Sequence, residues 1–348
     1  MSNTDVSPPI LLILRIAMHS KLLKAAFVVG ACVFAFTGNA FAQQTIRLAH
    51  TAAVSHAHHQ AAELFAKNVS ERTKGELKVE VYPSGELGDQ PALAEQVTMG
   101  ALDMAVVSLG NMAMYSKKLN AMTAPFLFEN YDQAHRAIDG YVMGWMNEGL
   151  KDYDCVGLSM FDYGFRQTTT QGVEIKSADD LKGLKIRVPP STGLLAAFDA
   201  LGANTQRIAY SELYTSLKQG VVVGEENPVF TILADSLYET QDQLAMTNHY
   251  FDCQVLLINK TLFEGFSEEE QTILREEAIN AQNLTRKLIS EGESAVVKQL
   301  QEKGMHVTYP DRQSFIDKMA PAYEKVGELA GKEEMQELLI AIKLVNQK

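Results

Sequence analysis

The chain has 348 residues, 46% of them hydrophobic and 21% charged, which is the composition of an ordinary globular protein. The length indicates two domains rather than one. With 43 acidic and 31 basic side chains the formal net charge is −12 at pH 7, which argues against nucleic acid or an anionic membrane surface as a partner.

Residues 1–42 have the pattern of a secretory signal peptide. Lys21 and Lys24 precede the apolar run AAFVVGACVFAF, and the cleavage motif AFA follows it at residues 40–42. Because the run is too short to cross a bilayer, it predicts export rather than a membrane span. We therefore expect the mature chain to lie outside the cytoplasm.

Two other features of residues 1–42 concern the start of translation and a possible lipid anchor. A separate apolar patch, LLILRIA, precedes Met18, which favours Met18 as the true start of translation. Cys32 in the sequence VGAC leaves a lipid anchor open as the alternative to soluble export. The cleavage motif downstream of Cys32 favours the soluble form.

The first part of the mature chain alternates strands and helices. TIRLAH predicts a short strand, residues 58–73 a helix, and residues 77–82 a second strand. After the break PSGELGDQ, the segment PALAEQVTM predicts a helix that ends at Gly100, and LDMAVVS predicts a third strand. This order favours an α/β fold with a largely parallel sheet.

The same alternation resumes beyond the middle of the chain. VGLSMFDYG and LKIRV are predicted strands, and SADDLKG between them is a short capped helix. Further helices are expected over residues 191–201 and 211–220, the second of them before VVVGEENP. Two α/β blocks of this kind predict two lobes that share a cleft.

The last third of the sequence is mostly helical. Ser267 and Glu270 fit a capping box, and the helix that follows can continue to about Gly304. A helix of that length suits a strut that lies across both lobes. Residues 305–309 then predict a short strand, and two more helices close the chain.

Neither enzyme chemistry nor a metal site is indicated by the motifs. The sequence has no G-x-S-x-G, P-loop, G-x-G-x-x-G or H-E-x-x-H motif. His56, His58 and His59 form a metal-like cluster, but no further ligand is marked, and a polar helix N-terminus is the simpler interpretation. We expect no enzyme activity, no cofactor and no bound metal.

Two arginines follow predicted strands of the second block. Arg166 comes after a strand in DYGFRQTTT, and Arg187 ends the next strand, in GLKIRVPPST. Ligands of open α/β sheets bind outside the carboxyl ends of the strands. The planar guanidinium pairs with a carboxylate through two hydrogen bonds. The positions of Arg166 and Arg187 do not by themselves decide whether they bind a ligand or are surface charges.

Several segments resemble, in order and in spacing, the periplasmic solute-binding proteins of TRAP transporters: YPSGELGD, GFRQTTT, DLKGLKIRVPPST, SELYTSLKQGVVVGEENP and LAMTNH. The resemblance implies an α/β, two-lobe periplasmic binding protein fold with a long hinge-spanning helix. Lobe I and the hinge helix would take residues 43–163 plus about 253–292, and lobe II residues 164–252 plus about 293–348.

The resemblance also implies which residues bind the ligand. Arg187 would pair with a ligand carboxylate, Arg166 would lie in the same pocket, and Asn227 would hydrogen-bond the ligand. In the first lobe the candidates are Thr51, just after the first strand, and Ser108, after the third. Relatives that bind sialic acid carry a glutamate where Ser108 stands, which argues against sialic acid here.

Some positions depart from the family pattern. The family usually reads G-V-V-D-G-Q-E-N-P, whereas this chain has Val223 and Glu225 in place of the aspartate and the glutamine. Arg207 adds a basic residue near the rim of the second lobe, which we expect to be a surface charge rather than a ligand contact.

The function implied is that of a receptor without enzyme activity. It would capture an organic acid, either a sugar acid or a small hydroxy acid, by closure of the cleft, and act as a monomer that delivers the acid to the large and small subunits of a sodium-driven TRAP membrane transporter. Three alternatives stay open: a receptor that feeds a signalling ectodomain, a periplasmic sugar-acid enzyme, and a zinc-binding receptor. Cys155 and Cys253 are expected to be buried free thiols rather than a disulfide.

Overall fold

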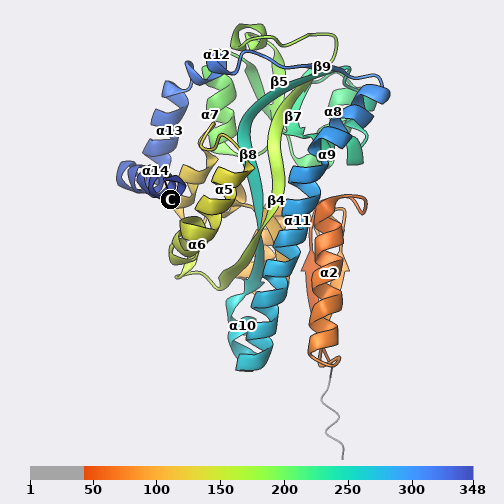
Figure 1. The fold of residues 1–348 in the computed structure, drawn as a ribbon, viewed down its shortest axis with the longest axis vertical. Helices are drawn as coiled ribbons and strands as arrows, with labels where there is room; N and C mark the ends of the chain where they lie inside the picture. The colour runs from red at the N-terminus through yellow and green to blue at the C-terminus, as the bar shows by residue number, and fades with distance from the viewer. Residues whose placement is uncertain (1–42, 348) are drawn as a thin grey trace, which may run out of the picture. The chain divides into compact units, whose positions relative to one another are not determined.

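A single mixed sheet runs through the part of the protein that the computed structural model describes, residues 43–347 (Figure 1). The predictions for the signal peptide, for Met18 and for Cys32 lie outside these residues. Within the described range the sheet has nine strands, in the order β2-β1-β3-β8-β4-β7-β5-β6, with β9 paired to β8. The strands are β1 (Gln44–Ala49), β2 (Leu77–Tyr82), β3 (Met104–Ser108), β4 (Cys155–Thr170), β5 (Lys185–Val188), β6 (Asn204–Arg207), β7 (Gly224–Pro228), β8 (Gln243–Asn259) and β9 (His306–Thr308).

Helices pack on both faces of this sheet and confirm most of the elements predicted from the sequence. They are α2 (Ala57–Arg72), α3 (Gln90–Thr98), α4 (Leu109–Met112), α5 (Tyr131–Ala137), α6 (Met143–Leu150), α7 (Thr192–Ala200), α8 (Leu213–Lys218), α9 (Val229–Ala234), α10 (Lys260–Gly265), α11 (Glu268–Glu302), α12 (Arg312–Ile316), α13 (Ala320–Ala330) and α14 (Lys332–Asn346). The segment SADDLKG forms a 3₁₀ turn, Ala178–Leu181, closed by a capping box from Ser177 and Asp180. None of the helices over residues 43–347 is long and apolar enough to span a membrane.

The expectation of a largely parallel sheet is wrong for the centre of the sheet. β1 pairs in parallel with β2 and β3, and β5 pairs in parallel with β6 and β7. The central pairs β3–β8, β4–β8 and β4–β7 are antiparallel. The reason is that β4 and β8 are long strands running in opposite directions, which join the two parallel blocks into one sheet.

The strand predicted at VGLSMFDYG is nearly twice as long in the structure, which corrects the position of Arg166. β4 continues through Gly164 to Thr170, so Arg166 lies inside a strand and not after one. Gly164 has a φ of 109° at a register irregularity in the pairing with β8, so the glycine marks a bulge and does not end the strand. β4 is buried on both faces, and it lacks the alternation that marks a half-buried strand.

Four clusters of buried hydrophobic side chains stabilise the fold, two at each end of the sheet. Alternate residues of β3 belong to different clusters: Val106 packs with Phe65 of α2, and Val107 packs in the cluster of Trp145. At the other end, one cluster contains Phe198 of α7 and the other contains Ile232 of α9. This division agrees with a two-lobe fold in which β4 and β8 cross between the lobes.

The 35-residue helix α11 connects the two ends, as the capping box at Ser267 predicts. Its first half packs with Leu274 into the cluster of α2, and its second half packs with Leu300 into the cluster of α9. Figure 1 shows α11 lying along β4, with α2 beside its lower part and α9 near its upper end. The predicted strut across both lobes is therefore confirmed.

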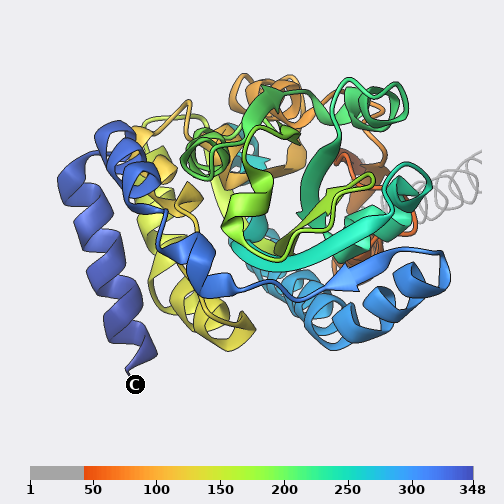
Figure 2. The same cartoon turned by 90° about the horizontal axis from the view of Figure 1, so that it is seen from above.

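The chain after β9 forms three helices, where the sequence predicted two. The additional one, α12, is a five-residue helix capped by Asp311. In Figure 2, α13 and α14 lie beside α5 and α6 at the edge of the molecule. Met335 and Leu338 of α14 pack into the same cluster as Trp145, at the first-lobe end. The lobe boundaries given above stay a prediction.

Candidate functional site

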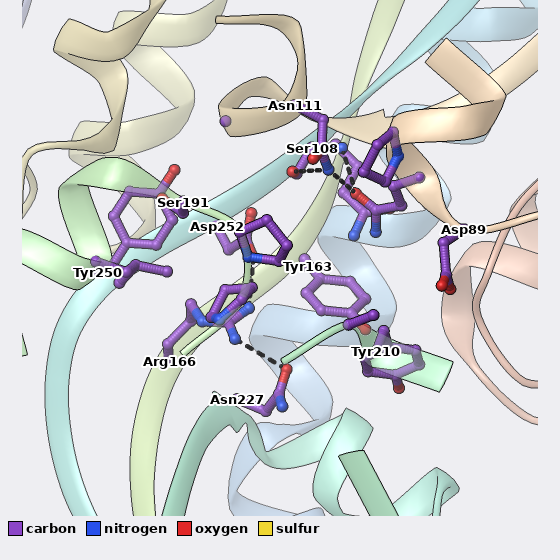
Figure 3. Close-up of a pocket in the computed structure, with 18 of the residues that line it drawn as sticks. Asp89, Ser108, Asn111, Tyr163, Arg166, Ser191, Tyr210, Asn227, Tyr250 and Asp252 are labelled. Atoms are coloured by element: carbon purple, nitrogen blue, oxygen red, sulfur yellow. Dashed lines mark hydrogen bonds and ion pairs between the residues drawn. The ribbon is translucent and has the colours of Figure 1, made fainter. Parts of the chain in front are cut away.

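A cavity of about 240 Å³ is lined by residues from both ends of the sheet (Figure 3). The first-lobe residues come from α3 and from the start of α4. The second-lobe residues come from β4, β7 and β8, from β5 with the segment that follows it, and from the segment after β6. Both predicted arginines line this cavity, although their surroundings differ.

Arg187 is a buried cation whose hydrogen bonds are incomplete. It lies on β5, is 1% exposed, and its Nε donates to the backbone oxygen of Ile208 at 3.0 Å. Its Nη1 is buried and has no hydrogen-bond partner among residues 43–347. Burial lowers the pKa of Arg187, although the charges of Glu226 and Glu225 oppose this. A guanidinium held in this way offers donors to an anion in the cavity.

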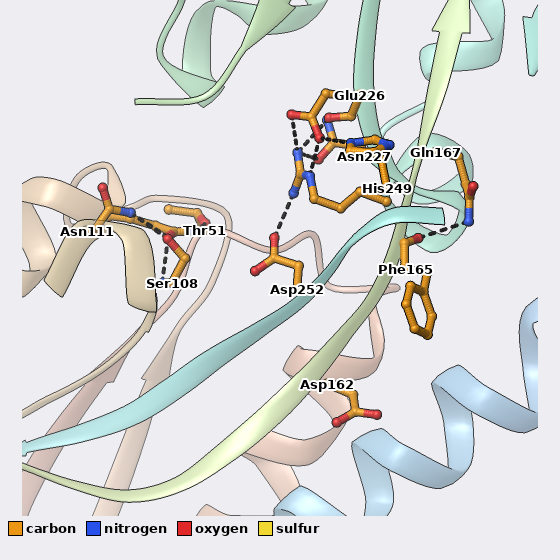
Figure 4. A network of polar contacts seen from close by, with 12 residues as sticks. Thr51, Ser108, Asn111, Asp162, Phe165, Gln167, Glu226, Asn227, His249 and Asp252 are labelled. Carbon is orange, nitrogen blue, oxygen red and sulfur yellow. Dashed lines mark hydrogen bonds and ion pairs between the residues drawn. The ribbon is translucent and has the colours of Figure 1, made fainter. Parts of the chain in front are cut away.

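Arg166, in contrast, is already fully paired with acidic groups. Its Nε donates to Glu226, its Nη1 donates to Asp252 at 2.7 Å, and its Nη2 donates to the side-chain oxygen of Asn227 at 3.0 Å (Figure 4). Burial alone would lower the pKa of Arg166, but the charges of Glu226 and Asp252 more than offset it, so the pKa is raised. Arg166 therefore links residues of β7 and β8 in the cavity wall, and it has fewer donors than Arg187 to offer a ligand.

Asn227, on β7, forms hydrogen bonds with both Arg166 and Glu225. Its Oδ1 accepts from Arg166, as the dashed line in Figure 3 shows, and its Nδ2 donates to Glu225. The side chain is 1% exposed and lines the cavity. One N–H of its amide is left for a further acceptor.

Ser108 and Thr51, the two candidates from the first lobe, line different cavities. Ser108 lines the same cavity as the arginines, and its Oγ accepts from the Asn111 amide at 3.0 Å. Thr51 lines a neighbouring hollow of about 330 Å³ instead, and its Oγ1 accepts from Gln90 at 3.3 Å. The structure thus brings Arg187, Arg166, Asn227 and Ser108 together, and it leaves Thr51 outside that group.

Several residues of the cavity carried no motif in the sequence. Asp252 and Gln254 on β8 line it, as do Tyr163 and Tyr210. β8 has 17 residues, all but a few of them buried, so nothing in its local pattern separates a cavity residue from a core residue. The one available signal was that Asp252 is the only acidic residue in the segment that forms β8.

Glu225, one of the two positions that depart from the resemblance, is completely buried next to these groups. Its Oε1 accepts from the Thr169 hydroxyl at 2.9 Å, and its Oε2 accepts from Asn227. Burial, followed by the charge of Glu226, raises the pKa of Glu225 to about 7, while Arg187 acts in the opposite direction. The carboxyl group therefore changes its ionisation near neutral pH.

This pKa predicts how the Glu225→Gln variant responds to pH. A raised pKa means that the folded state binds a proton that the unfolded chain has already released, so the stability it contributes is present below about pH 4.5 and is lost as pH rises through about 7. Glutamine stays neutral at all pH values. The free energy of unfolding of the variant should rise, relative to the unsubstituted protein, by about 1–3 kcal/mol between pH 5 and pH 8.

Urea unfolding of both proteins at several pH values measures this difference. The comparison cancels the titration of Asp252, which both proteins share. A difference that stays constant from pH 5 to pH 8 would contradict a raised pKa at Glu225.

The remaining sequence candidates lie outside the cavity. Arg207 is exposed on the surface, as expected. His56 caps α2 by accepting from the backbone of His58, and the ring of His58 contacts the backbone oxygen of Asp162 at 2.8 Å. No group of three or more His, Cys, Asp or Glu side chains that could hold a metal occurs in the described part of the chain. Cys155 and Cys253 are buried free thiols.

Comparison with known proteins relates this geometry to a family. Residues 48–329 match the model of the bacterial extracellular solute-binding proteins, family 7. The 2,3-diketo-L-gulonate-binding periplasmic protein YiaO of Escherichia coli is 33% identical over 84% of this chain and 89% of its own length.

Solved structures with the same fold include proteins with bound sugar acids. The sugar acid binding protein DctPAm from Advenella mimigardefordensis, in complex with galactonate, is 30% identical with a TM-score of 0.84, over 87% of this chain and 99% of that one. A TRAP periplasmic solute-binding protein from Sulfitobacter sp. NAS-14.1, with β-D-galacturonate bound, is also 30% identical with a TM-score of 0.82, over 86% and 99% of the two chains.

Proposed function

Because the chain belongs to the bacterial extracellular solute-binding proteins of family 7, the solute-binding proteins of TRAP transporters, we propose that its cavity binds a sugar acid through Arg187. In this proposal the protein is a periplasmic monomer without enzyme activity. It passes the acid to the large and small subunits of a TRAP membrane transporter. The bound ligands of the similar structures, galactonate and galacturonate, support a sugar acid as the substrate class.

The observation that carries the proposal is the incomplete pairing of Arg187. A buried charge is costly unless it is paired and hydrogen-bonded. Arg166 has carboxylate partners from the protein itself, whereas Arg187 has one backbone oxygen and a buried Nη1 without a partner in the described residues. A ligand carboxylate would supply both the missing charge and the missing acceptors in one geometry.

The arrangement of the cavity also supports capture by closure of the cleft. The carboxylate site at Arg187 and Asn227 belongs to the second-lobe end of the sheet, while Ser108 and Asn111 approach from the first-lobe end. A ligand that contacts both sets only when the lobes are together makes extra contacts in the closed state, so binding shifts the equilibrium toward closure. A transporter that prefers the closed form would then receive loaded receptors.

Thermal unfolding against a panel of organic acids tests this function. The mature chain is first unfolded and refolded to remove any carried-over ligand. A ligand that binds only the folded state adds RT ln(1 + [L]/Kd) to the stability, which is about 2.7 kcal/mol at 100 times Kd. We expect galactonate, galacturonate or another sugar acid of the panel to raise the melting temperature by several degrees.

Neutral sugars of the same size are the control, because they lack the carboxylate that Arg187 would bind. A panel without any shift, in protein that circular dichroism shows to be folded, would contradict the proposed function. Turnover of a sugar acid by the purified protein would contradict the absence of enzyme activity.

A further inference from the structure

One carboxylate in the cavity has an oxygen that no protein group satisfies. Asp252 lies on β8 and lines the cavity, and its side chain is 6% exposed. Its Oδ2 accepts from Arg166 at 2.7 Å, while its Oδ1 is buried and has no hydrogen-bond partner anywhere in the described chain. Most buried polar atoms are paired, so an unpaired carboxylate oxygen on a residue that lines a ligand cavity calls for an explanation.

We propose that Asp252 selects the ligand of this receptor: its free Oδ1 accepts a hydrogen bond from a hydroxyl group of the bound acid, and its negative charge rejects a second carboxylate. This inference rests on the proposed function, since it concerns the ligand held by Arg187. It narrows the substrate to a hydroxylated monocarboxylate and excludes diacids of the same carbon skeleton.

The charges of the cavity lining support this assignment. Arg166 and Arg187 are the cations among the lining residues, and Asp89 and Asp252 are the anions. Arg166 is already paired with Glu226 and with Asp252, so Arg187 is left as the one cation with free donors in the lining. The single charge of Arg166 is shared by two carboxylates, those of Glu226 and Asp252, so a second ligand carboxylate beside Asp252 would have no free cation to balance it.

The other labelled groups near Asp252 are neutral and suit hydroxyl groups of a ligand. In Figures 3 and 4, Asp252 lies between Ser108 and Asn111 on one side and Asn227 on the other. These are neutral groups that both donate and accept hydrogen bonds, as a sugar hydroxyl requires. Because a charged oxygen accepts the stronger hydrogen bond, Asp252 contributes most to the recognition of a ligand hydroxyl.

Matched pairs of acids test the inference by titration calorimetry. Galactonate and galacturonate are compared with galactarate, which has the same hydroxyl configuration and a second carboxylate, and glucuronate is compared with glucarate. The measurements are made at pH 8, because burial raises the pKa of Asp252 to about 6 and the group is ionised at that pH. We expect the better monoacid to bind about 100-fold more tightly than its diacid.

The Asp252→Asn variant should reduce this preference to about tenfold or less, through weaker binding of the monoacid and tighter binding of the diacid. Asp252→Ser, which replaces the charged carboxylate by a neutral hydroxyl, provides a second variant should the first fail to fold. Asp179→Asn removes a surface carboxylate that pairs with Lys318, and as the matched control it should keep the preference unchanged.

The possible outcomes separate this inference from the proposed function. Equal binding of a monoacid and its diacid would overturn the inference and leave the receptor function intact. A preference that persists in folded Asp252 variants would overturn the role of this residue. Failure of every acid to bind would instead overturn the proposed function.

Discussion

Replacement of Arg187 by alanine is expected to weaken the binding of the ligand carboxylate by about 2–5 kcal/mol, the usual loss when one partner of a buried charge pair is removed. Arg187 has free donors in the cavity, whereas the donors of Arg166 already engage Glu226 and Asp252. Arg187→Lys should also bind poorly, because one ammonium group cannot replace two parallel N–H donors. Titration calorimetry with the sugar acid identified by thermal unfolding measures both losses.

The Arg187→Ala variant also tests what Arg187 contributes to the stability of the ligand-free protein. Without ligand, Arg187 is a buried cation whose pKa is lowered by burial and which has no ion pair among the described residues, so its removal should destabilise the empty protein less than removal of Arg166 does. Arg207→Ala is the matched control, since Arg207 is exposed and lies outside the cavity. Near-normal affinity in Arg187→Ala or Arg187→Lys, or an equal loss in Arg207→Ala, would contradict the assignment.

Replacement of Arg166 is expected to have the opposite signature, a large loss of folding stability. In Arg166→Leu the buried carboxylates of Glu226 and Asp252 lose their cation, and breaking a buried pair in this way costs about 3–5 kcal/mol. Urea unfolding of the ligand-free protein measures the loss directly.

The pH dependence identifies the cause of that loss. In the unsubstituted protein Arg166 holds the pKa of Glu226 below its usual value although burial raises it, and Arg166 also opposes the raised pKa of Asp252. Without Arg166 the pKa values of both carboxyl groups rise, so the variant loses stability as pH increases. The destabilisation should be largest at pH 8 and smaller at pH 5. A loss that does not vary with pH, or a loss below about 1 kcal/mol, would contradict the buried pairing.

Local patterns predicted the individual elements well, because their signals lie within a few residues. The capping box at Ser267 and Glu270 predicted the start of α11, and the segment LKIRV predicted β5. The position of Arg187 near the end of that strand follows from the same local pattern. These features depend on propensity and capping, which a short window of sequence contains.

The errors concern features that depend on distant residues. Arg166 was placed after a strand because Gly164 was taken as its end, but pairing with β8 continues β4 beyond the bulge. The partners of Arg166 lie 60 and 86 residues away in the sequence. A short stretch of sequence around Arg166 therefore does not show that its charge is neutralised by the protein. The antiparallel centre of the sheet was missed for the same reason, because it depends on the pairing of β4 with β8.

The cavity itself was predicted only in part, for a related reason. The arginines and Asn227 belong to motifs, whereas Asp252 lies in a buried strand without one. Thr51 follows the first strand as expected, but it lines the neighbouring hollow instead. Which side of a strand end faces the ligand depends on packing between the lobes, and the sequence pattern does not contain that information.

A crystal structure of the mature protein with the sugar acid that gives the largest thermal shift tests the central claim most directly. The account predicts that the ligand carboxylate accepts hydrogen bonds from Arg187, including its Nη1, while Arg166 keeps its pairs with Glu226 and Asp252. A ligand whose carboxylate is bound elsewhere in the cavity, with Nη1 of Arg187 still unpaired, would contradict it.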